Sequence, residues 1–315
     1  MGREASGESG AELAETEAVE AAEAAEVRRH WQSLGLPGLA DIHVHFMPEP
    51  MHRKVQEFFD NAETNYGRAW PVQYRGSEAD RLQLLRAFGL RGIPSLAYPH
   101  KPGMAAWLND WCAEFAARVP DAVHSATLYP EEGVGDYVGE ALAAGARLFK
   151  VHVQVGRFSP ADELLDPAWR QLQEAVVPIV IHAGSAPQHG RFTGVGHVRE
   201  LLTRFPRLTL VIAHLGMPDY DAFADLVEEY PNVHLDTTMA ATDFADEYAP
   251  MPAEYVQRLG DLGDRVVFGA DFPNIPYPYV TQLQALERLE LGDDWLRGVL
   301  WTNGARLMGL PAAPD

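Results

Sequence analysis

The sequence has little cysteine, and it has no long apolar runs. Its one cysteine in 315 residues, Cys112, cannot form a disulfide within the chain, which is typical of proteins from a reducing compartment. No apolar run approaches the roughly 18–20 residues that a membrane-spanning helix requires, and the N-terminal residues do not follow the pattern of a secretory signal. We therefore expect a cytoplasmic protein. Cys112 lies in a predicted helix, where a buried and unreactive thiol is expected rather than a nucleophile.

Basic residues are also scarce. The 25 lysines and arginines are outnumbered by 45 acidic residues, which gives a formal net charge of −20. A surface of this charge repels nucleic acid and anionic membranes, so neither is expected as a partner. The charge does not identify a substrate; the site residues described below predict a small-molecule substrate. We also expect a homodimer, although no pattern in the sequence determines the oligomeric state.

Residues 1–28 differ in composition from the rest of the chain. They combine eight glutamates with many alanines and few apolar side chains. Alanine and glutamate favour a helix, but the segment offers too little apolar surface to pack firmly. It is therefore expected to be a disordered, mobile tail, followed by one domain over residues 29–315. Partner binding by the tail is the alternative.

After the tail, short apolar segments alternate with longer segments of helical pattern. This alternation predicts a parallel sheet with right-handed crossovers, and eight repeats in about 280 residues predict an α/β fold, the (β/α)8 TIM barrel. An open doubly wound sheet is the alternative, but the Gly-rich turn typical of that fold is missing after the first strand. The expected strands are 38–46, 92–98, 123–129, 147–155, 178–183, 208–215, 233–238 and 265–271. The expected helices are 104–119, 135–144, 160–175, 195–205, 219–230, 253–262, 279–291 and 293–310.

Residues 59–77 form the longest irregular region of this interpretation. Because the region follows the first expected strand, it would overhang the end of the barrel where active sites lie. Long loops in that position are often lids or substrate walls. We therefore expect it to cover part of the site.

The most informative motif is Asp41-Ile42-His43-Val44-His45, which ends the first expected strand. Side chains alternate along a strand, so His43 and His45 are expected to point the same way. Two neighbouring imidazoles on a rigid strand suit a metal ion, because imidazole is the commonest protein ligand for metals. Two unrelated histidines in a strand are the alternative.

Further ligand-type residues end other expected strands. Lys150 and His152 share one face of the fourth strand, and three more residues each end an apolar run: His182, His214 and Asp271. A buried polar group is costly unless a partner satisfies it, and a shared divalent ion would do so. Taken singly, each histidine could be a hydrogen-bonded core residue, and Asp271 could cap a turn. Their coincidence at one end of the barrel favours a metal site.

These segments together resemble the amidohydrolase superfamily, in particular the amidohydrolase-related branch that includes enzymes of the aminocarboxymuconate-semialdehyde decarboxylase type. The resemblance covers residues from about 38 to 310. The segments that carry it are Asp41 to His45, Phe149-Lys150-Val151-His152, Val180-Ile181-His182-Ala183-Gly184, Ala213-His214-Leu215-Gly216 and Phe268-Gly269-Ala270-Asp271-Phe272-Pro273. It implies that the metal, usually zinc or manganese, is bound by His43, His45, His182 and Asp271.

The resemblance leaves two roles open. His214 corresponds to a histidine that binds a second metal in binuclear members and faces the substrate in the decarboxylase branch. Lys150 corresponds approximately to a lysine that is carboxylated and bridges two metals in binuclear members. Because the strand continues beyond Lys150, its register is uncertain, and His152 is the alternative residue at the mouth of the barrel.

Two reactions are compatible with such a site. A bound divalent ion lowers the pKa of its water to about 7, Asp271 could act as general base, and His214 could stabilise charge on the substrate oxygen, which predicts a hydrolase of an amide, lactone or ester. A non-oxidative decarboxylase that uses the same residues is the alternative. A barrel that acts as a sensor rather than an enzyme is a third hypothesis.

Loops after the strands contain the expected substrate-binding residues. Four basic or potentially basic side chains would surround the mouth of the barrel, in addition to His152 within it: Lys101, Arg157, His189 and Arg191. Such a rim suits a small anionic molecule. Solvated loop charges that pair with nearby acidic residues are the alternative.

Overall fold

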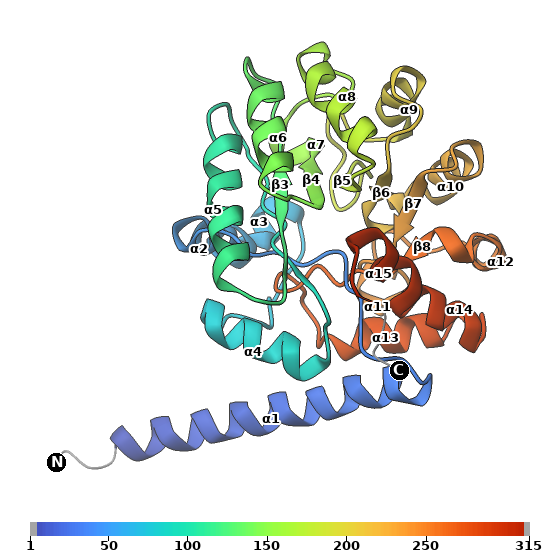
Figure 1. The fold of residues 1–315 in the computed structure, drawn as a ribbon. Coiled ribbons are helices and arrows are strands. Elements are labelled where there is room, and N and C mark those ends of the chain that lie inside the picture. Colours follow the sequence, from blue (N-terminus) through green and yellow to red (C-terminus); the bar gives the residue numbers. More distant parts are fainter. Residues whose placement is uncertain (1–4, 312–315) are drawn as a thin grey trace.

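Parallel strands lie at the centre of the structure, and helices surround them (Figure 1). The structure, a computed structural model, describes residues 5–311. Within this range six strands form a parallel sheet in the order β3-β4-β5-β6-β7-β8, and β1 and β2 form a short parallel pair. Strand order follows sequence order, and the expected (β/α)8 barrel is confirmed. The strands are β1 (Ile93–Pro94), β2 (Ala122–Val123), β3 (Ser125–Thr127), β4 (Leu148–His152), β5 (Ile179–His182), β6 (Leu210–Ile212), β7 (Val233–Asp236) and β8 (Val266–Val267).

The outer helices follow the expected pattern from residue 104 onward. They are α5 (Ala105–Arg118), α6 (Val134–Ala143), α8 (Asp166–Ala175), α9 (Val195–Arg204), α10 (Tyr220–Glu229), α12 (Ala253–Asp261) and α13 (Val280–Glu287). Short helical turns lie between them: α7 (Val153–Gly156), η1 (Glu163–Leu165), η2 (Ala213–Gly216), α11 (Asp243–Asp246) and η3 (Gly263–Arg265). None of the helices between residues 5 and 311 has the length and apolar character that crossing a membrane would require.

The first expected strand, 38–46, is not a regular strand. Leu39 and Val44 form isolated parallel bridges with Leu90 and Phe272, and single backbone hydrogen bonds connect the segment to both neighbours. The physical reason is the side chain of Asp41, whose Oδ1 accepts hydrogen bonds from the backbone of His43 and Ala270. The segment still lies between β1 and β8, the position that the barrel requires.

The expectation of an irregular region at 59–77 was partly wrong. Helix α2 (Glu49–Asp60) runs into the start of this region and α3 (Ala62–Tyr66) lies within it, while α4 (Glu78–Phe88) follows it. Residues next to its first turn determine where α4 begins, because the side chains of Ser77 and Asp80 form a capping box. The last expected helix, 293–310, is divided into α14 (Asp293–Arg297), a π-helical turn η4 (Gly298–Thr302) and α15 (Asn303–Met308).

The N-terminal segment also differs from the expected mobile tail. Helix α1 spans Ala5–Ser33 and packs against α4 and α13 on the outside of the barrel (Figure 1). Ala24 and Val27 are buried, whereas residues 15–19 are exposed. Two buried side chains and several side-chain hydrogen bonds anchor the C-terminal part of the helix. The predicted boundary at residue 28 therefore falls inside a continuous helix.

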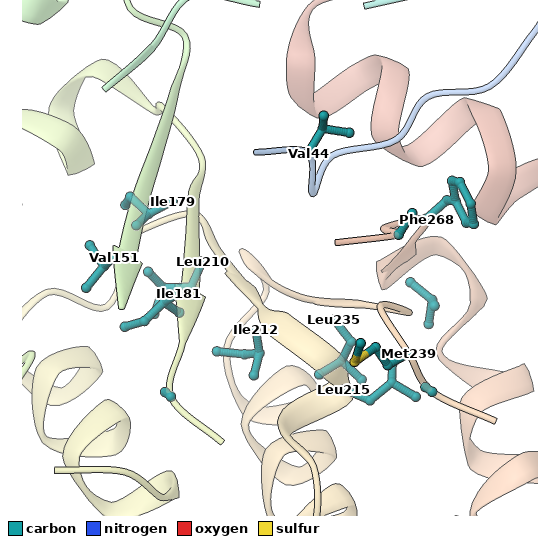
Figure 2. Close-up of a cluster of buried hydrophobic side chains, with 14 of the residues drawn as sticks. Val44, Val151, Ile179, Ile181, Leu210, Ile212, Leu215, Leu235, Met239 and Phe268 are labelled. Atoms are coloured by element: carbon teal, nitrogen blue, oxygen red, sulfur yellow. The ribbon is translucent and has the colours of Figure 1, made fainter. Parts of the chain in front are cut away.

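Strand alternation divides the apolar residues into an outer and an inner set. Figure 2 shows part of the outer set, including Val151, Ile181 and Ile212, which belong to the main core between strands and helices. Alternate residues, such as Leu148 and Val180, belong to a second cluster. Because side chains two residues apart share a face, Lys150 and His152 lie on the same face of β4 as Leu148.

A buried histidine inside the barrel, His234, makes the stability of the fold depend on pH. His234 on β7 is 5% exposed, and its Nδ1 atom is buried without a hydrogen bond. Burial, together with the charges of Arg306 and Arg265, lowers the pKa of His234 to about 4. The unfolded chain therefore binds a proton near pH 6.5 that the folded protein does not, so stability is lost as the pH falls from about 6.5 towards 4.

His234→Gln is expected to reduce this acid sensitivity. Between pH 8 and pH 5.5 the variant should lose about 1.5 kcal/mol less unfolding free energy than the unsubstituted protein. Chemical denaturation at the two pH values measures the difference. Equal losses in both proteins would show that His234 titrates normally in the folded state.

Candidate metal centre

Two histidines and an aspartate converge at the C-terminal end of the strands. Nε2 of His45 lies 2.8 Å from Oδ1 of Asp271, and Nε2 of His43 lies 3.6 Å from the same oxygen. Among the described residues, these three form a group whose ligand atoms all lie within 4.8 Å of one another. Both histidines are buried, and the side chain of Asp271 is 15% exposed. The structure thus brings together three of the four residues that the sequence predicted to bind a metal.

Hydrogen bonds fix the tautomers of both histidines. His43 Nδ1 lies 2.9 Å from Oδ2 of Asp236, and His45 Nδ1 lies 2.6 Å from the carbonyl oxygen of Leu96. Both oxygens act as acceptors, so each Nδ1 donates a proton outwards. Nε2 is then the ring atom of each histidine that faces the Asp271 carboxylate. Outward hydrogen bonds of this kind orient metal-binding histidines in proteins.

The close contact between His45 and Asp271 needs a proton or a cation. Burial would raise the pKa of Asp271, but the hydrogen bond with His45 and the neighbouring histidines hold it well below its usual range. A carboxylate 2.8 Å from an imidazole nitrogen requires a proton or a cation between the two atoms. A donor set of two imidazoles and one carboxylate suits zinc or manganese. The residues therefore fit a divalent ion.

Lys150 lies directly beside this group. It is fully buried on β4, and its Nζ atom donates to Nε2 of His43 at 2.8 Å. Burial lowers the pKa of Lys150 to about 8, although Asp236 and Asp271 favour its charged form. Burial and the charge of Lys150 lower the pKa of His43 to about 3, which keeps that imidazole neutral. An ion bound at His43 would take the lone pair that now accepts from Lys150.

Three further histidines line the same end of the barrel. The rings of His152 and His182 stack with centroids 4.1 Å apart, and His214 lies 4.8 Å from His182 and 5.3 Å from His43. Burial is the main cause that lowers the pKa of each of the three. His182 is not part of the converging group, because its Nε2 faces the carbonyl oxygen of Ala186 at 3.3 Å.

A cavity of about 1250 Å³ opens over His43, His45 and Asp271, the candidate metal-ligand group. Its walls come from the loops after the strands and from α2 and α3, so residues 59–77 do form a wall as expected. Aromatic side chains contribute much of the lining, among them Phe58, Tyr66, Trp70, Tyr98, Trp107 and Phe192.

The predicted substrate-binding residues are divided between several places. His152, Arg157 and Arg191 line the cavity. His189 instead lines a neighbouring pocket of about 630 Å³, next to Asp219. Lys101 is exposed and, in the described part of the chain, lines neither of the two cavities. Two basic residues that the sequence interpretation did not select, Lys54 and His100, line the large cavity.

Sequence reasoning also missed Asp236. Its fully buried carboxylate accepts from His43 Nδ1 and from the backbone of His214 at 2.9 Å. Burial would raise the pKa of Asp236, but its electrostatic interaction and its hydrogen bond with His43 hold the pKa well below its usual range. Asp236 thereby orients the ring of His43 and holds the backbone of His214. The sequence did contain a pattern that could have indicated Asp236, because this aspartate ends an apolar strand just as Asp271 does.

Gly269 allows His43 and Asp236 to approach each other. A Cβ atom at this position would lie 2.4 Å from Thr238 Oγ1 and 2.9 Å from His43 Cβ. Gly269→Ala is therefore expected to displace His43 and to weaken divalent-metal binding at least about tenfold, as disturbed orienting contacts do. Gly196→Ala is the matched control, because a Cβ there meets no atom within 4 Å. Isothermal titration with Mn²⁺ compares the two, and equal affinities would contradict the assigned role.

The fold and the site together define a class of protein. Ligand-type side chains gather at the C-terminal ends of the strands of a parallel barrel, the position of active sites in (β/α)8 enzymes. The sequence matches the family model described as Amidohydrolase over residues 40–310. The chain belongs to the amidohydrolase family and is an enzyme of that family.

Solved structures of similar fold agree with this placement. An uncharacterized TIM-barrel protein from Bordetella bronchiseptica is 18% identical, with a TM-score of 0.67 over 86% of this chain and 98% of that chain. A protein described as a 2-pyrone-4,6-dicarboxylic acid hydrolase, from Pseudomonas putida, is 14% identical, with a TM-score of 0.58 over 88% and 99% of the two chains.

A third similar structure is 5-carboxyvanillate decarboxylase LigW2 from Novosphingobium aromaticivorans, which contains bound manganese. It is 16% identical, with a TM-score of 0.58 over 88% of this chain and 98% of that chain. No curated protein sequence matches the chain. At these identities the structural likeness concerns the fold.

Proposed function

We propose that the protein is a metal-dependent hydrolase that acts on a small anionic molecule with an amide, lactone or ester bond. The observation that carries the proposal is the convergence of His43 Nε2, His45 Nε2 and the Asp271 carboxylate at the base of a large cavity. Arg157 and Arg191 in the cavity wall supply positive charge for an anionic group.

The metal is proposed to be zinc, with manganese as the alternative. His43, His45 and Asp271 would hold it, and His182 is the proposed fourth ligand after its ring turns away from the Ala186 carbonyl. When bound, the ion supplies an activated water and polarises the substrate carbonyl group. Lys150 is proposed to remain a free amine or to become carboxylated, depending on whether one or two metals bind.

The roles of the side chains follow from their positions. Asp271 lines the cavity, and its carboxylate would hold the proton released from water and return it to the leaving group. His214 lies beside His43 and His182 and donates to the substrate oxygen as negative charge develops. The hydrogen bond from the backbone N–H of His214 to Asp236 holds the backbone that carries this ring.

A non-oxidative decarboxylase is the second candidate. The aromatic lining and the two arginines suit an aromatic carboxylate as well as a lactone. The likeness to the 5-carboxyvanillate decarboxylase supports this candidate, and the likeness to the protein described as a pyrone dicarboxylic acid hydrolase supports the first. In the second candidate, Asp271 or His214 would deliver a proton to carbon as CO2 leaves.

One assay distinguishes the two candidates. The protein loaded with Zn²⁺ or Mn²⁺ is incubated with a panel of lactones and a panel of aromatic carboxylates, and ring opening and CO2 release are followed separately. Ring opening without CO2 is the expected result, and CO2 release would favour the decarboxylase. Turnover that persists in His43→Ala, or no turnover in either panel, would count against the proposed function.

A further inference from the structure

Helix α1 lies outside the matched family region, which begins at residue 40. Its C-terminal part nevertheless packs against the outer helices of the barrel. Ala24 and Val27 are buried, and the helix packs against α4 and α13 (Figure 1). Glu23 faces this interface and makes hydrogen bonds to both the α13 segment and Tyr74.

Glu23 completes the start of α13. The hydroxyl of Tyr74 donates to Glu23 Oε1 at 2.6 Å and accepts from the backbone N–H of Tyr279 at 2.6 Å. The N–H of Val280 also points to Glu23 Oε1, at 3.4 Å. The first N–H groups of a helix lack partners within the helix, and α13 has no cap from its own N-terminal residue. A carboxylate from α1 supplies the missing acceptor.

Tyr279 connects this cap to the metal-ligand group. Its ring is fully buried, and its hydroxyl donates to Asp41 Oδ2 at 2.8 Å. The other oxygen of Asp41 accepts from the backbone N–H of His43 at 3.0 Å and of Ala270 at 3.2 Å. His43 is itself a candidate ligand, and Ala270 directly precedes Asp271. Asp41 therefore holds the two metal-ligand segments together.

We propose that Glu23 is a positioning residue of the metal centre. It fixes Tyr279 through Tyr74 and the start of α13, and Tyr279 fixes the carboxylate that aligns His43 with Asp271. The helix outside the family region is thus part of the support of the active site. The part of this inference that concerns metal affinity rests on the proposed function, whereas the part that concerns backbone order does not.

Backbone order is tested first, on metal-free protein. Hydrogen exchange of segment 41–46, followed by mass spectrometry, reports on the His43 amide whose hydrogen bond ends at Asp41. Glu23→Ala and Tyr279→Phe are expected to raise its exchange rate at least about fivefold. Tyr279→Phe removes the hydrogen bond to Asp41, and Glu23→Ala removes an acceptor that holds Tyr279 through Tyr74. Glu26→Ala is the matched control. Glu26 also connects α1 to α13, through Gln284 at 2.8 Å, but makes no contact with this hydrogen-bond chain.

Metal affinity is tested second, by titration with Mn²⁺. Tyr279→Phe should weaken binding about tenfold and Glu23→Ala about threefold, as loss of outer contacts does. Glu23→Gln should restore most of the affinity, because its amide oxygen can still accept from Tyr74.

The inference is overturned if Glu23→Ala exchanges at the rate of the unsubstituted protein, or if Glu26→Ala raises exchange equally. A purely general role of α1 in folding would produce the second result. If the unsubstituted protein binds no divalent ion, the proposed function fails, and the exchange experiment still decides the role of Glu23.

Discussion

Asp271→Asn is expected to lower kcat about 10³-fold in the metal-loaded protein, in line with the loss of a general base. The amide retains the shape of the side chain but cannot hold the transferred proton, and it no longer balances the positive charge of a cation. Asp271 has a left-handed backbone conformation, with φ of 69°. Asparagine tolerates this conformation, so the fold should remain intact. Steady-state kinetics and thermal unfolding, measured side by side, check both parts.

Two possible results decide whether Asp271 takes part in the reaction. A loss of kcat together with an unchanged melting temperature assigns the defect to chemistry or metal binding. A variant that keeps kcat within about tenfold of the original value would remove Asp271 from the catalytic machinery, because a positioned acid–base group contributes at least about 10²-fold.

Removal of divalent ions by a chelator is expected to abolish activity completely. His43, His45 and Asp271 bring two imidazole nitrogens and a carboxylate together but provide no strong nucleophile among themselves. Stoichiometric Zn²⁺ or Mn²⁺ should restore turnover, because the ligand atoms are already held in place by Asp236 and the Leu96 carbonyl. Activity of the chelated and the reloaded protein is measured under identical conditions.

The metal content of the reloaded protein determines the state of Lys150. One ion per chain is expected if Lys150 stays an amine, in which case the ion replaces Lys150 Nζ as the partner of His43 Nε2. Two ions per chain would indicate a carboxylated Lys150 that bridges them. Full activity of the chelated protein, with no metal detected, would contradict a metal-dependent reaction of either kind.

The barrel could be predicted because its strands are short, apolar and regularly spaced. For most strands the predicted cores, such as 178–183, contain the observed ladder residues. The first strand was harder, because Asp41 replaces ladder hydrogen bonds with side-chain bonds that no local pattern reveals. Helix α1 was judged by its own apolar content, whereas its stability depends on partners such as Tyr74 that lie far away in the sequence.

The site could be predicted to the extent that strand ends determine position. His43, His45 and Asp271 meet because parallel strands end at one edge of the barrel. Loop residues are less constrained, and Lys101 and His189 therefore lie away from the large cavity. The sequence also does not determine which way a histidine ring points. His182 is an example, because its Nε2 faces the Ala186 carbonyl oxygen.

The most direct test is a crystal structure of the Mn²⁺-loaded protein with anomalous diffraction data. The account predicts one strong anomalous peak within coordination distance of His43 Nε2, His45 Nε2 and the Asp271 carboxylate. A map with no peak at these three side chains, or with the ion bound elsewhere on the protein, would contradict it.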